Sequence, residues 1–378
     1  MINYLPLNMF LEEYSERNTN NQYKPVAVGR YGIRTRESIY SKELANEYSK
    51  NKLIYKNTLT VGMGSNQIDI GILSDDITYS VSPAYHTFHI SNIDSNYLDY
   101  CLQCRNQDMF ARYVKRGSRQ GKTIELKRWL TYEIPVYEKN KQIDIVHKLD
   151  HIKKIIELKN DQLNKYDLIV KARFIEMFGD ILNDKTLPMV QLNELADIGS
   201  SKRIYANEYV ESGIPFYRSK EIRELGAGLK PSVELFIKQE RYDEIREKYG
   251  VPKMGDILIA AIGATIGYSW IVDSNSPFYY KDGNLIILSV KDNVNSIFLN
   301  HVMGILIEDF KKKGVSGSAQ LALTIEKLEK MMVVNPKLSL QNQFADFVKQ
   351  VDKSKLAVQK GLQELEILKK SLMQQYFG

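Results

Sequence analysis

The residue types that could do chemistry gather first in Gly117-Ser-Arg-Gln-Gly-Lys-Thr123, a short segment with two glycines, a lysine and hydroxyl side chains. Such a segment could bind phosphate, because the backbone amides of a glycine-rich loop and a nearby lysine can surround phosphate oxygens. A nucleotide-binding loop of this type has four residues between its glycines, whereas this segment has three. The spacing therefore disfavours nucleotide binding and favours a loop that contacts DNA phosphates or packs locally.

Three further groups of residues could bind a metal or act in catalysis. Cys101 and Cys104 form one isolated C-x-x-C without the second ligand pair of a structural zinc site, and their helical pattern predicts burial. His147 and His151 are four residues apart but have no third ligand nearby, so we expect exposed helix surface. Asn275-Ser-Pro-Phe278 resembles the Asn-Pro-Pro-aromatic motif of amino-methyltransferases, but it lacks the first proline and no glycine-rich cofactor loop precedes it. We expect no catalytic residue, metal or cofactor in this chain.

Basic residues are concentrated at two places in the chain. The net charge is +6, from 52 basic and 46 acidic residues. From Arg112 to Arg128 the only acidic residue is Glu125, and Lys311-Lys312-Lys313 forms a second basic run. A basic run is usually a solvated surface, but one that recurs beside a Gly-Ser loop indicates contacts with nucleic-acid phosphates.

The two basic regions belong to an internal repeat. Phe110 to Gln120 (FARYVKRGSRQ) returns as Phe310 to Gln320 (FKKKGVSGSAQ), with Phe, Gly, Ser and Gln in register. The two copies are followed by similar extended segments and long helical stretches, which end in Met177-Phe178-Gly179 and Tyr376-Phe377-Gly378. After the repeated loop the second copy has Leu321-Ala322-Leu323 in place of Gly-Lys-Thr, which further disfavours a nucleotide loop. The chain is therefore predicted to be a diverged tandem duplication of a whole domain.

The stretches that follow the repeat have a heptad pattern of apolar residues. One seam runs from Ile145 to Met177 and the other from Phe344 to Leu372, and the remaining positions are mostly charged or polar. Helices of about 36 residues and about 54 Å are predicted, and each needs a partner for its apolar stripe. We expect the two helices to pair in an antiparallel coiled coil related by a pseudo-twofold axis.

These elements divide the chain into four segments. Residues 1–138 and 181–338 are predicted to be mixed domains of strands and helices, because runs such as Ile257 to Ile262 and Leu285 to Val290 indicate strands. Residues 139–180 and 339–378 are predicted to be the two long helices. The expected fold class is α+β, with two mixed α/β domains separated by two long antiparallel coiled-coil helices.

Length and composition are those of a globular protein. The chain has 378 residues, of which 43% are hydrophobic and 26% charged. No apolar run is long enough to cross a bilayer, and the first residues lack the pattern of a signal peptide. We therefore expect a cytoplasmic protein with no membrane partner.

Several short motifs, most of them in the second half of the chain, resemble those of a known protein family. They are Leu192-x-x-Leu195-Ala-Asp-Ile198, Gly213-Ile-Pro-Phe-Tyr-Arg218, Gly255-Asp-Ile-Leu258, Gly263-x-x-x-Gly267, Gly317-Ser-Ala-Gln320 and Leu368-Lys-Lys-Ser-Leu372. Together with the duplicated domain and heptad helix, they resemble the DNA specificity (S) subunit of type I restriction-modification systems. The first half keeps Gly117-Ser-Arg-Gln120 and Ile134-Pro135 but lacks the Gly-Ile-Pro and Gly-Asp-Ile motifs.

The resemblance implies a DNA-recognition function without catalysis. Two target-recognition domains would read the two halves of a bipartite site in double-stranded DNA, and the helices would set the spacer. The helices would also dock two methyltransferase subunits, which bind S-adenosylmethionine. Motor-nuclease subunits that use ATP and magnesium would complete the assembly.

The predicted DNA-binding residues carry hydrogen-bond donors or acceptors on expected loops. Arginine and glutamine can bind guanine and adenine edges, whereas lysine and serine more often bind phosphates. An ordinary surface charge or local hydrogen bond is the alternative at each position. In the first module the candidates are Arg30, Tyr31, Arg34, Arg36, Ser65, Asn66, Ser118, Arg119, Gln120 and Lys122, and in the second Ser201, Lys202, Arg203, Tyr217, Arg218, Lys220, Ser318 and Gln320.

Two other functions remain open from the sequence. The chain could be a freestanding DNA-binding or antirestriction protein that mimics the specificity subunit, and such a protein would not co-purify with methyltransferase chains. It could also be a solitary DNA adenine methyltransferase, in which case the isolated chain would bind S-adenosylmethionine.

Overall fold

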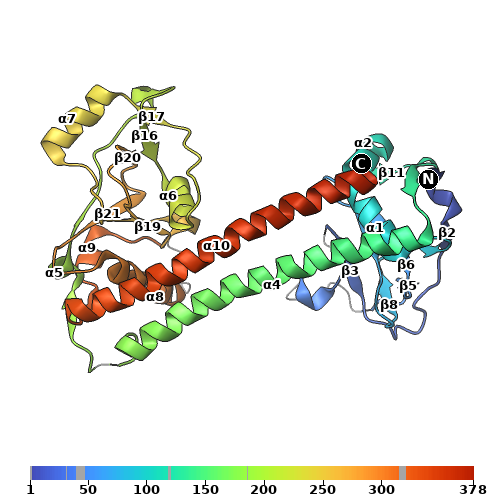
Figure 1. Ribbon diagram of the computed structural model, residues 1–378, viewed down its shortest axis with the longest axis horizontal. Helices are drawn as coiled ribbons and strands as arrows, with labels where there is room; N and C mark the ends of the chain where they lie inside the picture. Colours follow the sequence, from blue (N-terminus) through green and yellow to red (C-terminus); the bar gives the residue numbers. More distant parts are fainter. Residues whose placement is uncertain (1, 31, 40–46, 118–120, 185, 315–320) are drawn as a thin grey trace. The chain divides into compact units, whose positions relative to one another are not determined.

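The structure, a computed structural model of the chain, describes residues 2–30, 32–39, 47–117, 121–184, 186–314 and 321–378 (Figure 1). Two compact units are present, Met1–Gln162 together with Val358–Gly378, and Leu163–Ala357. Both contain helices and antiparallel sheet, which confirms the predicted α+β class. A search of the described residues finds no helix with the length and apolar character needed to span a membrane.

The first unit is built on a four-stranded antiparallel sheet with the order β2-β9-β6-β7. Its face that carries Ile68 and Ile70 packs in the core with helices α1 and α2, because side chains alternate along a strand. The hairpin of β3 and β4 packs against β7 with Ile33 beside Gly71, where a Cβ would lie 2.7 Å from Ile33 Cγ1. The bounds are β2 (Leu11–Tyr14), β3 (Val26–Gly29), β4 (Gly32–Thr35), β6 (Thr58–Met63), β7 (Ile68–Ile72), β9 (His86–Ile90), α1 (Ser95–Cys104) and α2 (Asn106–Tyr113).

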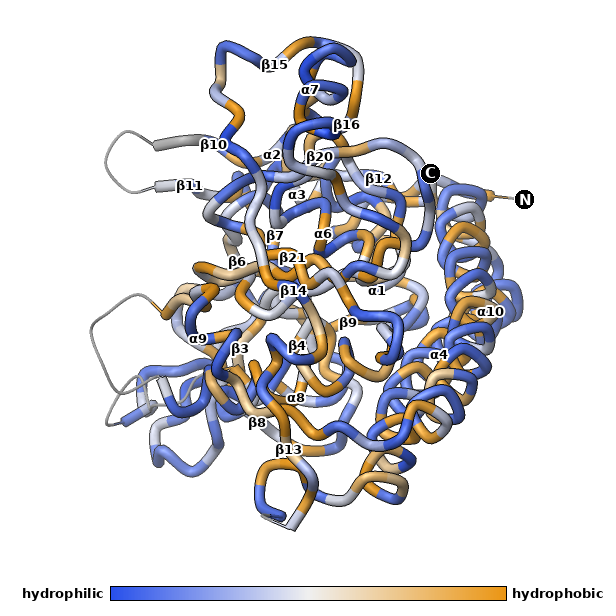
Figure 2. The backbone as a smooth tube through the Cα atoms, turned by 90° about the vertical axis from the view of Figure 1, so that its left-hand side faces the viewer, coloured by the Kyte–Doolittle hydropathy of each residue, from blue (hydrophilic) through white to orange (hydrophobic). Residues whose placement is uncertain are grey.

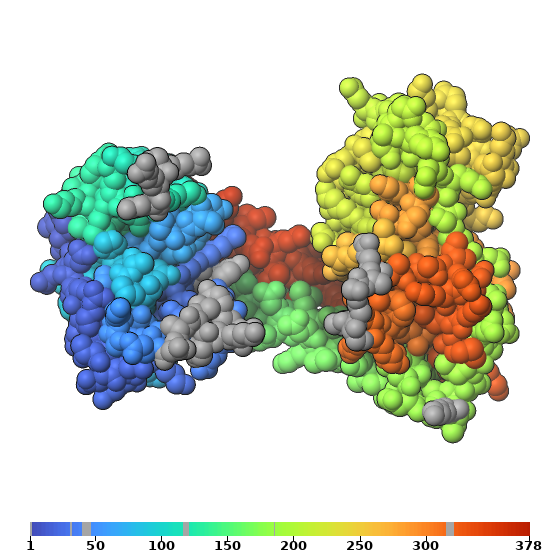
Figure 3. Space-filling model, turned by 180° about the vertical axis from the view of Figure 1, so that it is seen from behind, coloured from blue at the N-terminus to red at the C-terminus, as the bar shows by residue number. Residues whose placement is uncertain are grey.

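The second unit contains a sheet of the same topology, β14-β21-β18-β19, also antiparallel throughout. Its two faces bury separate cores: Ile257 and Ile259 pack with α8, whereas Leu258 and Ala260 pack against a second sheet, β15-β17-β16-β20. Figure 3 shows residues 200–250 (yellow-green to yellow) and residues 296–314 and 321–330 (orange to orange-red) as adjoining regions of this unit. The bounds are β14 (Ala196–Gly199), β15 (Tyr209–Val210), β16 (Ile214–Tyr217), β17 (Phe236–Ile237), β18 (Ile257–Ala260), β19 (Ser269–Ile271), β20 (Tyr279–Tyr280), β21 (Leu285–Val290), α6 (Ser219–Gly226), α7 (Gln239–Tyr249) and α8 (Ser296–Gly314).

A two-stranded sheet also occurs at the same place in both units. β1 (Asn3–Pro6) pairs with β12 (Glu133–Val136), and β13 (Met189–Gln191) pairs with β22 (Met332–Val334), in each case just before a long helix. The extended segments predicted after the repeat are therefore strands. The remaining elements are η1 (Leu7–Met9), η2 (Arg36–Ser38), β5 (Lys52–Ile54), β8 (Tyr79–Val81), β10 (Val114–Gly117), β11 (Gly121–Ile124), α3 (Leu126–Trp129), α5 (Leu192–Leu195), η3 (Ala206–Glu208), η4 (Gly263–Thr265) and α9 (Ile325–Glu329).

The long helices α4 (Lys139–Phe178) and α10 (Leu338–Phe377) have 40 residues each, slightly more than expected. In the first unit the start of α4, at Ile145, shares a core with Phe377 at the end of α10. In the second unit the end of α4, at Phe174 and Phe178, shares a core with Phe344 at the start of α10. The two helices therefore pack antiparallel, as predicted, and apolar and polar residues alternate along both (Figure 2).

Single contacts are also duplicated between the units. The Gln142 side chain of α4 accepts a hydrogen bond from Asp94 N (3.0 Å) and donates one to Tyr137 O (2.8 Å). Its counterpart Gln341 of α10 accepts from Asn295 N (2.9 Å) and donates to Pro336 O (2.8 Å). Both glutamines are buried, so each connects the start of its long helix to the loop before α1 or α8.

Replacing either glutamine with alanine should lower the free energy of unfolding by about 2 kcal/mol, because a buried N–H and a buried carbonyl lose their partners. Urea-induced unfolding of Gln142→Ala and Gln341→Ala would measure the loss, with Gln363→Ala, an exposed position of α10, as the control. A large loss in one variant and none in the other would contradict the structural equivalence of the two sites.

His301 of α8 should make the stability of the second unit dependent on pH. Its ring lies between Phe174 and Phe344, at centroid distances of 4.8 and 5.1 Å, and its Nε2 has no hydrogen-bond partner among the described residues. Burial lowers the pKa of His301 to about 4, from an ordinary value near 6.5.

Because the unfolded chain binds the His301 proton more readily, stability should fall as pH decreases from about 6.5 to about 4. Replacement by phenylalanine removes the titrating group but keeps a ring of similar size. The difference in free energy of unfolding between wild type and His301→Phe, measured across this window, should therefore change in favour of the variant at low pH. A difference independent of pH would show that His301 is accessible to protons in the folded state.

Candidate nucleic-acid interface

In both units the segment that follows the repeated loop lies against a hairpin turn of the four-stranded sheet. This is the β6–β7 turn in the first unit and the β18–β19 turn in the second. In the first unit Lys122 of β11 donates a hydrogen bond from Nζ to Ser65 O, in the β6–β7 turn, and its Nζ lies 5.3 Å from the centroid of the Phe110 ring. In the second unit Leu323 N donates to Ala261 O (2.9 Å), at the β18–β19 turn, and Ala322 forms a β-bridge with Ile262. Ser118, Arg119, Gln120, Ser318 and Gln320 lie outside the described residues.

Of the other predicted DNA-binding residues of the first unit, those that the structure describes lie on or next to the β3–β4 hairpin and in the β6–β7 turn. Arg30 follows β3 and Arg34 lies in β4, and both are exposed, as are Ser65 and Asn66 in the β6–β7 turn. Tyr31 lies outside the described residues. The Arg36 guanidinium lies 4.9 Å from the centroid of the Tyr48 ring and donates to its hydroxyl (3.4 Å).

A cavity of about 270 Å³ in the first unit is lined by Arg36, Gly62, Met63 and Tyr85, among others. The Tyr85 ring packs directly on the backbone of Gly62, where a Cβ would lie 2.2 Å from the ring. The Tyr85 hydroxyl donates to Val28 O (3.0 Å). Tyr85 therefore joins the β3–β4 hairpin, which carries the predicted arginines, to strand β6, which leads to Ser65.

In the second unit Ser201 and Lys202 line a groove of about 830 Å³, together with residues of β14, β21 and the segment after α7. The Lys202 N–H donates to the Tyr279 hydroxyl (2.7 Å), and its Nζ lies 4.3 Å from the centroid of the Tyr249 ring. Ser201 Oγ is buried without a hydrogen-bond partner among the described residues. The neighbouring Arg203 is paired with Asp282 (2.8 Å). Lys202 therefore offers a cation in the groove without a carboxylate partner within the described part of the chain, whereas the adjacent Arg203, which does not line the groove, is paired.

Tyr217, Arg218 and Lys220 lie together at the end of β16 and the start of α6, and all three already have partners. The Tyr217 ring stacks on Phe278 (4.9 Å), and burial raises the pKa of its hydroxyl. Arg218 pairs with the buried carboxylate of Glu221 (2.9 Å) and with Glu234 (2.8 Å), which Lys220 also contacts (2.6 Å).

The ion pairs of Arg218 and Lys220 bear on their predicted DNA contacts. Lys220 and Arg218 lower the pKa of Glu234 to about 2, and Arg218 compensates the buried charge of Glu221. A DNA contact by Arg218 would have to weaken these pairs, and breaking a buried pair is costly. A base contact by Arg218 or Lys220 therefore stays a prediction. Arg218 also has a structural role, because it pairs with the buried carboxylate of Glu221.

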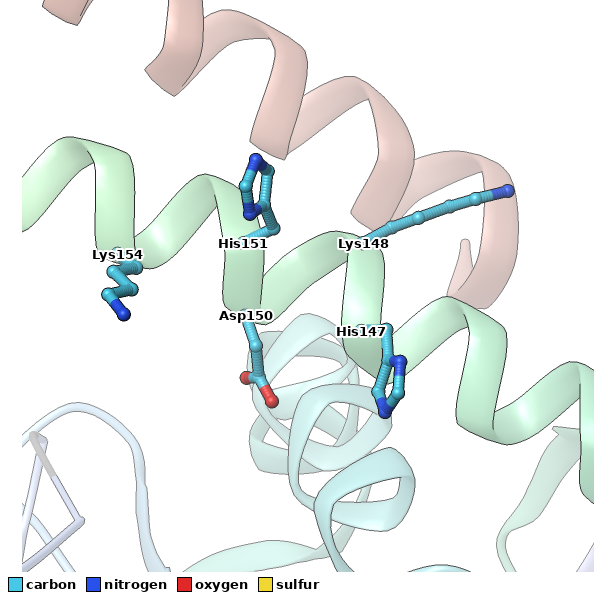
Figure 4. Close-up of a pocket in the computed structure, with 5 residues that line it drawn as sticks. All are labelled: His147, Lys148, Asp150, His151 and Lys154. Atoms are coloured by element: carbon cyan, nitrogen blue, oxygen red, sulfur yellow. The ribbon is translucent and has the colours of Figure 1, made fainter.

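The structure also describes the residues that the sequence considered for metal or redox chemistry. Cys101 is buried, and burial raises the pKa of its thiol to about 12, whereas Cys104 donates to Met373 O (3.5 Å). His147 and His151 are exposed on α4 (Figure 4), and the adjacent Asp150 accepts a hydrogen bond from the Tyr100 hydroxyl (2.6 Å). Within the described ranges no group of three or more histidine, cysteine or acidic residues could hold a metal ion.

Two exposed residues beside the β18–β19 turn were not singled out from the sequence. Tyr268 follows Gly267 of the Gly263-x-x-x-Gly267 motif, and Arg223 of α6 lies over its ring, with Cζ 6.0 Å from the centroid. The glycine turn itself was recognised, but the pairing with α6 depends on residues more than forty positions earlier and gave no local signal.

Comparison with known proteins finds a family model and a curated relative that each match about half of the chain. Residues 185–367 match the family model described as the type I restriction modification DNA specificity domain. The chain is 28% identical over 198 residues to the Haemophilus influenzae protein named as type I restriction enzyme specificity subunit S.HindORF215P, a match that covers 52% of this chain and 48% of that protein. The match thus spans about half the length of this relative.

Solved structures show the same fold along the whole chain. The S subunit of a type I restriction-modification system from M. genitalium has a TM-score of 0.58 at 15% identity, covering 100% of this chain and 96% of that one. A chain from a structure on complex assembly and conformational transition of the type I R-M system has a TM-score of 0.59 at 16% identity, covering 100% and 97%. Residues 185–367 are thus similar to the type I restriction modification DNA specificity domain, and the whole chain shares the fold of the solved S subunit.

Proposed function

We propose that this chain selects the DNA sequence for a type I restriction-modification complex, with each of its two domains reading one half of a bipartite site. The main support is the repeated topology, β2-β9-β6-β7 and β14-β21-β18-β19, with the segment next to the repeated loop on the same hairpin turn in both. Two equivalent modules fit a site with two half-sites, and their different surface residues fit half-sites of different sequence. Base contacts from the turns would give specificity, while basic residues would bind phosphates.

The long helices would set the distance between the half-sites. Each has 40 residues, about 60 Å at 1.5 Å per residue, and each has its two ends in the cores of different units. In this proposal the paired helices act as a rigid spacer, with their heptad seams packed against each other. The accepted spacer between half-sites would then depend on helix length.

The helices also carry exposed apolar residues that neither unit uses for packing. Leu168 and Ile169 of α4 are 64% and 47% exposed, and Ile367 and Leu368 of α10 are 70% and 47% exposed. We call these the two exposed pairs. Each pair precedes the terminal phenylalanine of its helix, Phe178 or Phe377, by the same number of residues, so the pairs are equivalent in the repeat. Duplicated apolar surface supports the docking of two copies of one partner, which we propose to be the methyltransferase subunit.

Catalysis would belong to the partners. In this proposal the methyltransferase subunits bind S-adenosylmethionine and flip and methylate the target base, whereas motor-nuclease subunits use ATP and magnesium. The chain itself would bind double-stranded DNA and protein only.

Sequencing the methylated adenines in DNA treated with the complex of this chain and its cognate methyltransferase subunit would test the proposal. The expected result is an asymmetric bipartite motif with a fixed gap. Methylation at a single uninterrupted motif, or methylation that persists when this chain is omitted, would contradict it.

A further inference from the structure

The β18–β19 turn of the second unit has a firmly held backbone that exposes an aromatic ring. Gly263 and Gly267 have φ values of +69° and +89°, which favour glycine, and a Cβ at Gly267 would lie 2.8 Å from Ile307 Cγ2. The Tyr268 N–H donates to Thr265 O (3.1 Å), and Tyr268 O accepts from Ala260 N (2.8 Å). The Tyr268 ring, 46% exposed, is thus carried on backbone that is fixed on both sides.

Helix α6 brings a cation to this ring. α6 packs beside β19 (Figure 1), and its last residue, Gly226, approaches so closely that a Cβ there would lie 2.2 Å from Ser269 O. This contact places the exposed Arg223 over Tyr268, with Cζ 6.0 Å from the ring centroid, at the outer limit of a cation–π contact. A guanidinium held over a ring still directs N–H donors outward, where they can bind two acceptors at once.

Arg223 differs from the arginines that were predicted in the second unit. Arg203 and Arg218 are paired with carboxylates, whereas Arg223 has no carboxylate within ion-pair distance among the residues that the structure describes. A DNA contact by Arg223 would therefore not have to break an ion pair. Tyr268 adds an exposed face that can stack on a base or a sugar.

Arg223 and Tyr268 lie at a place in the second unit that corresponds to the predicted DNA interface of the first unit. The β18–β19 turn is the counterpart of the β6–β7 turn, which carries Ser65 and Asn66 and contacts Lys122. In both units this turn lies next to the segment that follows the repeated Gly-Ser-x-Gln loop.

On the basis of the proposed DNA recognition, on which this inference rests, we propose that Arg223 and Tyr268 determine base specificity in the half-site read by the second domain. Arg223 would bind a base edge with two hydrogen bonds, and Tyr268 would orient it and stack on the nucleic acid. A bidentate contact of this kind discriminates against the wrong base by about tenfold to a hundredfold.

The test uses the complex of the full chain with its methyltransferase subunit on a DNA library in which both half-sites are randomised. In Arg223→Ala and Tyr268→Ala, the base preference at one or two positions of the second half-site should fall by about tenfold to a hundredfold, while the first half-site is unchanged. Tyr268→Phe should keep the preference, because the ring makes the contact. The matched control is Arg246→Ala, which removes an arginine at the same 6.0 Å from a tyrosine ring, that of Tyr242 in α7, and should leave both half-sites unchanged.

The possible outcomes separate this inference from the proposed function. If the wild-type complex selects a bipartite site and both alanine variants keep its full preference, the assignment of Arg223 and Tyr268 is wrong and the proposed function stands. An equal loss on all DNA, with unchanged base preference, would show phosphate binding and would also overturn the specificity role. If Tyr268→Phe loses as much as Tyr268→Ala, the ring does not make the contact. If the wild-type complex selects no bipartite site, the proposed function itself fails.

Discussion

Adding seven residues to each long helix, after Gln162 in α4 and after Ala357 in α10, should lengthen the spacer accepted between the half-sites by up to about three base pairs. Both insertion points lie where a helix passes from one unit to the other. Seven residues make almost two helical turns and add about 10 Å, so the apolar seam keeps its register. B-DNA rises about 3.4 Å per base pair, which sets the upper limit of the change.

Methylation of a DNA library with spacers of all lengths would measure this change. The same seven residues inserted into the loop after α6, at Leu229, provide a control that lengthens the chain without lengthening either helix. The spacer hypothesis would be wrong if the helix variant stayed active and accepted only the original spacer. Both half-site sequences should remain those of the wild type, because neither insertion changes a turn of the sheets.

Replacing both residues of one exposed pair with aspartate should remove one methyltransferase subunit from the complex. Burial of a leucine or isoleucine contributes about 2 kcal/mol, so loss of a pair should weaken docking by about a thousandfold. We expect Leu168→Asp with Ile169→Asp to leave one partner, Ile367→Asp with Leu368→Asp to leave one partner, and the fourfold variant to leave none.

Native mass spectrometry of the reconstituted complexes would count the subunits. Leu158→Asp, at a position of α4 that is also exposed but has alanine at the equivalent place in α10, is the matched control and should keep both partners. Retention of two partners by the fourfold variant would exclude the exposed pairs as the docking surface. Thermal unfolding should be little changed in all variants, because these side chains contribute little to either core.

The large features of the fold could be predicted because their patterns are local. Heptad spacing gives a long helix directly, and the recurrence of residues 110–120 as residues 310–320, with similar helix ends at Phe178 and Phe377, indicated the repeat, so the antiparallel pair was predicted correctly. The equivalence of the two sheets was not visible from the sequence. The strands that contain Leu59 and Leu258 have equivalent neighbouring strands in the two sheets. Strand pairing, however, depends on contacts between residues that are distant in the sequence, and many different sequences can make such contacts.

The candidate site was harder to predict for the same reason. The sequence located the turns that carry Ser65 and the glycine motif before Tyr268, since turn residues have local signals. The sequence could not show that Arg218 already forms ion pairs with Glu221 and Glu234, or that α6 brings Arg223 to the β18–β19 turn. Which cation is available to DNA depends on its neighbours in space.

The sharing of each long helix between two cores has a consequence for biosynthesis. The second unit is continuous, Leu163–Ala357, whereas the first needs Val358–Gly378, including Phe377, which packs against Tyr97 (5.2 Å) and whose carbonyl accepts a hydrogen bond from Arg105. On the ribosome the core of the first unit therefore stays incomplete until residues 358–378 have been translated. A chain truncated before Phe377 would leave the core of the first unit open, and such a product would expose apolar surface around Tyr97, far along the sequence from the truncation.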